Sequence, residues 1–279
     1  MQEGTPSRTA WAAAVHRAAH QVLEDGRVFS DPFALRILGL SAENIKREEE
    51  SRRARSRMRL FIAARTRFAE DALASAVALG FNQLVILGAG LDTFAYRNPF
   101  GDRLHIFEVD HPATQAWKRG LLEAAVIGIP ESLSFAPIDF ERQTLGEGLA
   151  AAGLDSRQPT FFTWLGVVPY LNEDAIWSTL GFIASLPNGA QVVFDYSNPP
   201  ETLPPAQRAD HDIRAARVAE LGEALVTYFE ADTLHSGLAA LGFKHIQDMG
   251  PSEIRVRCFS NRTRTASDKG GHILRAASV

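Results

Sequence analysis

The sequence lacks several features that would point to particular classes of protein. It has one cysteine, Cys258, so no disulfide can form within the chain and an oxidising compartment is not indicated. It has no apolar run of about 18 residues, which excludes a membrane-spanning helix. The first residues have neither the basic nor the apolar region of a signal peptide. These absences predict a cytoplasmic protein that does not enter a membrane.

Strong charge of one sign is also missing. The formal net charge is −4, which is too small to favour nucleic acid or an anionic membrane as a partner. One basic cluster follows the acidic residues 48–50, and we interpret it as a solvated helix face with ion pairs. Its members are Arg52, Arg53, Arg55, Arg57 and Arg59. No His, Cys or carboxylate group has the spacing of metal ligands, so we predict no metal, and we interpret Cys258 as a small buried hydrophobe.

What remains is the composition of an ordinary globular protein, with 46% hydrophobic and 22% charged residues. A chain of this length can bury a large core without crosslinks, and we expect one domain over residues 1–279. We divide it into a helical lid (1–80), a ligand-binding βαβ core (81–197), and further lid helices with closing strands (198–279). In the first part, helices are expected over residues 10–25, capped by Ser7 or Thr9, over 33–38, and twice within 42–79.

From residue 82 onward, short β-branched and apolar runs alternate with helical segments. This alternation is typical of right-handed βαβ units and of a parallel sheet covered on both faces. The expected strands are Gln83–Leu87, Leu104–Val109, Leu133–Ile138, Thr160–Leu165, Gln191–Tyr196, Phe243–Met249 and Gly271–Ala277. The expected helices are 112–125, 145–152, 173–185 and 206–241, the last with a break near 229–232. The sequence therefore predicts a doubly wound α/β fold with a Rossmann-like, seven-stranded and mostly parallel sheet.

The most informative segment is the turn that follows the first strand, Gly88-Ala89-Gly90. Glycine permits backbone angles that other residues avoid, and it lets a ligand lie against the main chain. A Gly-x-Gly turn alone can be no more than a tight turn. The second strand, however, ends in Glu108 and Asp110, which lie 20 and 22 positions after Gly88 (108 − 88 and 110 − 88). Nucleotide-binding units place a ribose-binding carboxylate at that spacing.

Either acid could bind ribose, because alternate residues of a strand share a face. We assign the role to Asp110 and keep Glu108 as the alternative; a helix cap ahead of Pro112 is the structural interpretation. A nicotinamide-binding fingerprint would have a third glycine where this chain has Thr93. Asp92 would also repel a pyrophosphate at that point. The turn therefore suits a cofactor that has no phosphate and carries positive charge, such as S-adenosylmethionine.

The order of these motifs resembles the leucine carboxyl methyltransferase family, and in particular its bacterial O-methyltransferases, including polyketide-tailoring ones. The resemblance extends from about residue 7 to residue 196. It is carried by the runs Ile62–Arg67, Leu87–Arg97, Phe107–Pro112, Pro137–Phe140 and Trp164–Leu171. It implies a class I methyltransferase fold with an N-terminal helical lid and S-adenosyl-L-methionine as the cofactor.

The resemblance also implies roles for individual residues. Arg65 matches the arginine that holds a carboxylate of the cofactor or the substrate, Gly88 the cofactor-loop glycine, and Asp139 an acid near the adenine amine. Arginine is suited to this role because its guanidinium can grip a carboxylate with two parallel hydrogen bonds. Asp139 could equally be a loop cap, and Arg97 matches a position that we interpret as partly structural.

One position departs from the family pattern. Eukaryotic members have a glutamate where this chain has Leu165, which puts a protein C-terminal carboxylate in doubt as the substrate. We expect Trp164 and Tyr170 nearby to contact the cofactor and a small apolar or aromatic acceptor; core packing is the alternative for both aromatic residues. A phenolic acceptor would need a general base, for which His111 and Tyr170 are the nearest candidates.

Together these observations predict an S-adenosylmethionine-dependent O-methyltransferase. The acceptor would be a small-molecule carboxylate or hydroxyl, Arg65 and Tyr170 would be catalytic, and a homodimer is compatible with the sequence. The predicted cofactor residues are Arg65, Gly88, Ala89, Gly90, Glu108, Asp110, Asp139 and Trp164. Two alternatives stay open, an NAD(P)-dependent oxidoreductase and a cofactor-binding protein without transferase activity.

Overall fold

The computed structural model describes residues 7–50, 56–140, 142–259 and 267–279. For Glu49 and Glu50 it describes the backbone alone. The first six residues and three arginines of the basic cluster, Arg52, Arg53 and Arg55, lie outside these ranges. The other two behave differently from each other. Arg57 makes an exposed ion pair with Asp210 at 3.0 Å, whereas Arg59 is buried and pairs with Glu24 at 2.6 Å. The interpretation as a solvated face therefore holds for Arg57 and is wrong for Arg59.

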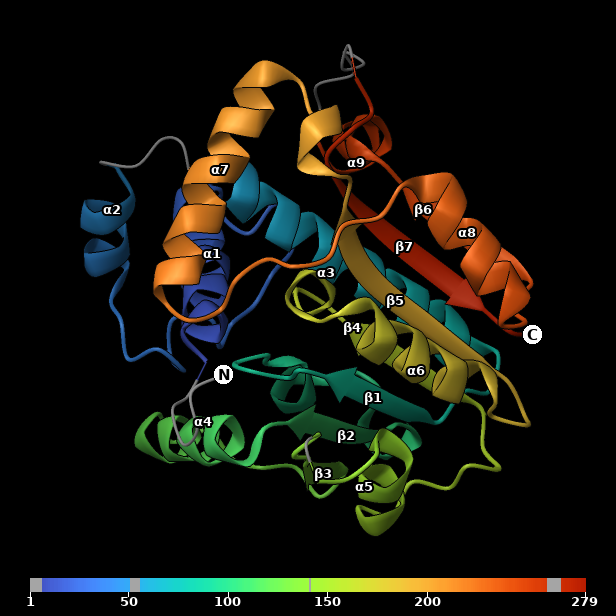
Figure 1. Ribbon diagram of the computed structural model, residues 1–279. Coiled ribbons are helices and arrows are strands. Elements are labelled where there is room, and N and C mark those ends of the chain that lie inside the picture. Colours follow the sequence, from blue (N-terminus) through green and yellow to red (C-terminus); the bar gives the residue numbers. More distant parts are fainter. Residues whose placement is uncertain (1–6, 51–55, 141, 260–266) are drawn as a thin grey trace.

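In the described part of the chain the sheet has seven strands, in the order β3-β2-β1-β4-β5-β7-β6 (Figure 1). β1 to β5 run parallel, and β7 runs antiparallel between β5 and β6. The strands are β1 (Gln83–Leu87), β2 (His105–Asp110), β3 (Leu133–Pro137), β4 (Thr160–Trp164), β5 (Ala190–Ser197), β6 (His245–Met249) and β7 (Gly271–Ala277). The predicted fold class is confirmed, and each predicted strand lies within two residues of its observed bounds.

Helices cover both faces of the sheet, as the continuous apolar strands require. The helices are α1 (Arg8–Leu23), α2 (Ala42–Glu50), α3 (Ser56–Ala78), α4 (Pro112–Ala124), α5 (Leu145–Ala151), α6 (Glu173–Ala184), α7 (Pro205–Glu220), α8 (Ala231–Ala240) and α9 (Pro251–Cys258). One face packs Val85, Phe162 and Phe194 against α5, α6 and α8. The other packs Leu84, Ile106 and Phe161 against α3 and α9. Both layers are visible in Figure 1.

The N-terminal segment has two different parts. α3 packs directly on the sheet and belongs to the helix layer of the core. α1 forms a smaller apolar cluster with the turn segment after it and with α2, built around Ala18, Ile37 and Ile45. Ser7 caps α1 by accepting a hydrogen bond from the amide of Ala10 at 3.1 Å. Of the predicted lid over residues 1–80, the part outside the sheet layers is therefore shorter, because α3 packs on the sheet as part of the core.

Three sequence predictions differ from the structure. Residues 33–38 form consecutive turns and not a helix, because the buried side chains of Ala34 and Ile37 fix them against α1 and α2. The predicted helix 206–241 is interrupted from Leu221 to Glu230. Gly222, near the start of this interruption, has a positive φ of 78° that ends the helix. α9 was not predicted, although Pro251 at its first position is a common helix start.

No helix within the described ranges is both long and apolar enough to cross a membrane. Cys258, at the end of α9, is partly buried and packs against the α3 face of the core. Burial raises the pKa of its thiol, which keeps it protonated at neutral pH. The interpretation of Cys258 as a packing residue agrees with this position.

Candidate active site

The glycine turn lies where β1 leaves the sheet. Gly88 and Gly90 have φ angles of 64° and 44°, in the left-handed region that side chains disfavour. The amide of Ala89 donates to Val109 O at 3.0 Å, and the amide of Gly90 donates to Asp110 Oδ2 at 2.6 Å. The three turn residues predicted from the sequence are therefore held against the end of β2.

Asp110 is the acid that joins the two strand ends. Its Oδ1 accepts from the amide of His111 at 2.7 Å, in addition to the bond from Gly90. Burial raises the pKa of Asp110, and these two amide bonds oppose that rise. A carboxylate has about four lone-pair positions, so Asp110 can still accept hydroxyl donors beyond the two amides.

Glu108 lies on the same strand but has a different environment. It is fully buried, and Lys118 Nζ of α4 donates to its Oε2 at 2.7 Å. Burial raises its pKa to about 7, an effect that the Lys118 cation opposes. Its Oε1 has no hydrogen-bond partner. The pairing with Lys118 favours a structural role for Glu108 and leaves Asp110 as the better ribose candidate.

Asp139 lies at the end of β3, beside Asp110. The amide of Ile138 donates to the backbone oxygen of Asp110 at 3.0 Å, which ties the two loops together. The carbonyl of Asp139 accepts from the amides of Arg142 and Gln143, and its carboxylate lies 3.3 Å from Arg142 Nε. The residue thus starts the turn that leads towards α5, in a partly exposed place where an adenine amine could reach it.

Arg65 extends from α3 to the ends of β4 and β5. Its Nη1 donates to Asp195 Oδ2 at 2.8 Å, and its Nε is buried without a partner. Asp195 Oδ1 accepts from the amide of Gly166 at 2.6 Å. A Cβ built on Gly166 would lie 2.6 Å from Arg65 Nη2, so a glycine there leaves room for the guanidinium.

Asp195 was missed in the sequence. The signal that could have found it is an acid inside the apolar run of the fifth strand, Val192-Val193-Phe194-Asp195. A charged residue in such a strand needs a partner. That partner is Arg65, which is 130 positions away in the chain.

The aromatic residues predicted at the site separate into two groups. Trp164 is 2% exposed and packs in the core against Phe194, so its position favours the packing alternative. Tyr170 is partly exposed, and Arg214 and Arg65 lie close enough to act on its hydroxyl electrostatically. Burial raises the pKa of Tyr170, so at neutral pH it is a hydrogen-bond donor and a poor general base. His111 Nδ1 accepts from the amide of Ala113 and caps α4, which gives it a structural role.

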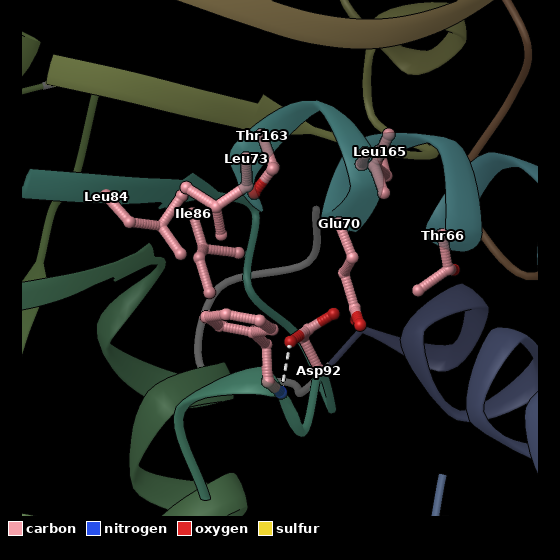
Figure 2. A pocket seen from close by; sticks show the side chains of 10 residues that line it. Thr66, Glu70, Leu73, Leu84, Ile86, Asp92, Thr163 and Leu165 are labelled. Atoms are coloured by element: carbon pink, nitrogen blue, oxygen red, sulfur yellow. Dashed lines mark hydrogen bonds between the residues drawn. The ribbon is translucent and has the colours of Figure 1, made fainter. Parts of the chain in front are cut away.

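A narrow pocket opens beside the glycine turn, between α3 and the ends of β1 and β4 (Figure 2). Figure 2 shows the carboxylates of Glu70 and Asp92 pointing towards one another. Burial raises the pKa of Glu70, and the charge of Asp92 adds to that rise. The free volume is about 20 Å³, enough for one water molecule. Asp92 supplies negative charge to this pocket, whereas Glu70 is paired with Arg97.

Two parts of the chain, Val167 and the start of α1, lie directly on the glycine turn. A Cβ built on Gly88 would overlap Val167 Cγ2, and one built on Gly90 would lie 3.0 Å from Ala10 Cβ of α1. Glu223, in the segment after α7, accepts from the amide of Arg8 at 2.7 Å and from the hydroxyl of Thr9. The start of α1 is thus held between the turn and the 221–230 segment.

A buried ionic network anchors the other end of the lid. Asp31, whose side chain is fully buried, accepts from the Thr93 hydroxyl at 2.7 Å and lies 3.6 Å from Arg17 and 3.7 Å from Arg97. Arg97 also forms a two-pronged pair with Glu70. Arg97 is therefore structural, in agreement with the sequence interpretation.

The residues at the turn fit a cofactor that has ribose hydroxyls, a cationic end and a carboxylate. Asp110 offers free acceptor positions, Asp92 supplies negative charge, and Arg65 has a buried Nε without a partner. A pyrophosphate would be repelled by Asp92. No group of three or more His, Cys, Asp or Glu that could hold a metal was found within the ranges described. The sheet order and this turn define a class I methyltransferase.

Comparison with known proteins identifies the family. Residues 10–184 match the family described as leucine carboxyl methyltransferase, which is more than half of the chain. YktD of Bacillus subtilis is 37% identical over 205 residues, covering 71% of this chain and 66% of the relative. A Streptomyces coelicolor relative is 35% identical over 184 residues, with 63% and 64% covered. Both names assign these relatives to the S-adenosyl-L-methionine-dependent methyltransferases. The alignments span slightly less than two thirds of their lengths.

A structure from Thermobifida fusca, assigned to the methyltransferases, covers 99% of this chain and 96% of its own, with a TM-score of 0.58 and 13% identity. It shows a shared fold. The chain belongs to the leucine carboxyl methyltransferase family. The resemblance to the leucine carboxyl methyltransferase family is confirmed.

Proposed function

We propose that this protein is an O-methyltransferase that moves the methyl group of S-adenosylmethionine to a carboxylate or hydroxyl oxygen of a small molecule. The family and the cofactor come from the comparisons, whereas the acceptor and the methylated atom are part of this proposal. One observation carries it: the Arg65–Asp195 pair, held by Gly166 at the ends of β4 and β5 and next to Tyr170. This arrangement offers hydrogen-bond donors to an oxygen-bearing acceptor.

The cofactor supplies an already activated methyl group, so the protein has to provide alignment and exclude water. Asp110 would hold the ribose, Asp139 the adenine amine, and the pocket at Asp92 the cationic amine. Arg65 would bind a carboxylate through Nη2 and Nε. Val167 and α1, which lie on the turn, would close over the bound cofactor.

The residues favour an acceptor that ionises easily. A carboxylate is charged at neutral pH and needs no base. Tyr170 has a raised pKa and His111 is occupied as a helix cap, so neither serves readily as the base that a phenol would need. The core position of Trp164 removes one aromatic contact proposed for the acceptor.

A methyl-transfer screen tests the proposal. The full chain would be incubated with S-adenosylmethionine carrying a labelled methyl group and with panels of small carboxylic acids, phenols and amines. The proposal expects label in an acid or a hydroxyl compound, with equal release of S-adenosylhomocysteine. Label only in amines would contradict O-methylation. Cofactor binding without transfer to any panel would favour a binding protein that has no transferase activity.

A further inference from the structure

Arg214 is an arginine that forms no ion pair with any carboxylate of the described residues. It lies on the inward face of α7, in line with the buried His211 three positions earlier. Its Nη1 approaches the sulfur of Met58 on α3 at 3.9 Å, a weak contact, and its Nε is buried without a partner. No carboxylate lies within 4.0 Å of Arg214 in the described part of the chain. Burial lowers the pKa of the guanidinium.

Three arginines that are more deeply buried than Arg214 do have carboxylate partners. The pairs are Arg17 with Asp31 at 3.6 Å, Arg59 with Glu24 at 2.6 Å, and Arg65 with Asp195 at 2.8 Å. A buried cation without an anion lowers stability, because it loses hydration and gains no ion pair in return. Groups left in that condition are concentrated at functional sites. Arg214 is therefore the one to examine for a ligand.

The surroundings of Arg214 belong to the proposed acceptor side of the site. The amides of Val226 and Thr227 bond to the carbonyl of Pro169, which brings the segment that carries Tyr228 beside Tyr170. Asp195 and Arg65 lie near enough to Arg214 to act on it electrostatically. The Tyr228 hydroxyl lies 3.0 Å from His211 Nε2, which fixes that ring beside α7. Asp195 is already shared between Arg65 and the amide of Gly166. Asp195 is therefore taken up by Arg65, and no carboxylate of the described residues comes within 4.0 Å of Arg214.

We propose that Arg214 binds a carboxylate of the methyl acceptor, which makes it the residue that selects acids, and aromatic acids in particular, as substrates. The proposal rests on the proposed function, because it assigns the acceptor side of the same site. The planar guanidinium presents paired donors that match a carboxylate, and Tyr170 and Tyr228 offer ring faces to an aromatic body. The segment 221–230 carries Tyr228 and also Glu223, so the same segment would cover the acceptor and the start of α1.

The test uses Arg214→Met, which keeps the length of the side chain and removes the charge. Arg217→Met, one turn further along α7 on the exposed side, is the matched control. Each full-length protein is first saturated with S-adenosylhomocysteine, so that the cofactor's own carboxylate is already bound. Benzoate is then titrated by saturation-transfer NMR, with benzamide as the neutral probe of the same shape.

We expect wild type and Arg217→Met to bind benzoate in preference to benzamide. In Arg214→Met the affinity for benzoate should fall on the order of 10- to 100-fold, the loss of a charge-assisted pair. The melting temperature of Arg214→Met should equal or exceed that of wild type, because a desolvated cation is removed. A purely structural arginine would instead give a lower melting temperature.

Several results would overturn the inference. Equal benzoate binding in wild type and Arg214→Met would do so, and so would the absence of benzoate binding to wild type. If only Arg214→Met loses S-adenosylhomocysteine, Arg214 serves the cofactor and the proposed function stands without this inference. If wild type itself does not bind S-adenosylhomocysteine, the proposed function fails first. Should Arg214→Met not fold, Arg214→Gln decides: it removes the charge and keeps a polar side chain, and unchanged benzoate binding would refute the assignment.

Discussion

The amide of Gly90 donates a hydrogen bond to Asp110 Oδ2 at 2.6 Å, so the turn after β1 and the acid at the end of β2 form one unit. The bond fixes the orientation of the carboxylate while it leaves further lone pairs free. It also explains why the sequence spacing between Gly88 and Asp110 was informative. Both members of the predicted cofactor site depend on this contact.

Replacing Asp110 with Asn should weaken cofactor binding on the order of 10- to 100-fold, because the amide keeps the shape but loses the charge that strengthens the hydroxyl bonds. The dissociation constant for S-adenosylhomocysteine, measured by calorimetry, checks this. Glu123→Gln on α4, an exposed carboxylate, is the control. Unchanged affinity in Asp110→Asn would remove Asp110 from the cofactor site.

Arg65 is the second test. Because Asp195 is buried and depends on it, Arg65→Ala should lower the free energy of unfolding by about 3–5 kcal/mol and is a poor probe of catalysis. Arg65→Lys keeps the charge and loses the two-pronged grip, so turnover should fall at least about tenfold with most of the stability kept. Urea unfolding and initial rates separate the two effects. Arg67→Lys, exposed on the same helix, should show neither; full activity of Arg65→Lys would contradict the assigned role.

The contact between Glu223 and the start of α1 predicts a lid that can be loosened. In Glu223→Gln the bonds to the amide of Arg8 and to Thr9 lose their charge, so the first turn of α1 should fray. Hydrogen–deuterium exchange of residues 8–12 should accelerate, and S-adenosylhomocysteine should dissociate faster. Glu220→Gln, exposed at the end of α7, is the matched control. The same exchange rates in Glu223→Gln and wild type would show that Glu223 does not hold the start of α1.

Glu108 gives a prediction for pH. Its pKa is raised to about 7 in the folded protein from an unfolded value of 4.5, so the folded state binds more protons between these values. The free energy of unfolding contributed by this group should therefore fall as pH rises from 4.5 to 7, by up to about 3 kcal/mol, and stay constant above 7. Glu108→Gln should remove that slope, although the unpaired Lys118 lowers its overall stability. Urea unfolding over this range measures it, and equal slopes in both proteins would contradict the burial argument.

The sequence was most informative where local and global preferences agree. The strand β1 and its turn were predictable because a buried apolar run followed by Gly88-Ala89-Gly90 has few other solutions. β7 was also predicted, from the short run Gly271–Ala277. The family resemblance then linked these pieces to a cofactor.

Long-range pairing could not be predicted. Nothing in the sequence marks Lys118 as the partner of Glu108, or Asp195 as the partner of Arg65, because each pair forms only once the sheet is assembled. The interruption of the helix after Glu220 has a similar cause: the amides of Val226 and Thr227 bond to the carbonyl of Pro169, a contact that helical propensity does not contain. For Trp164, which the sequence allowed as ligand contact or core, the position in the core favours packing.

The central claim, that the turn at Gly88–Gly90 binds S-adenosylmethionine, is tested most directly by a thermal-shift titration with S-adenosylhomocysteine, with NAD and NADP in parallel. At about 100 times the dissociation constant the ligand should add about 2.7 kcal/mol to the free energy of unfolding. For a chain of this size we expect a rise on the order of 5–10 °C in melting temperature with S-adenosylhomocysteine alone. A rise with NAD or NADP alone, or no rise with any of the three, would contradict the account.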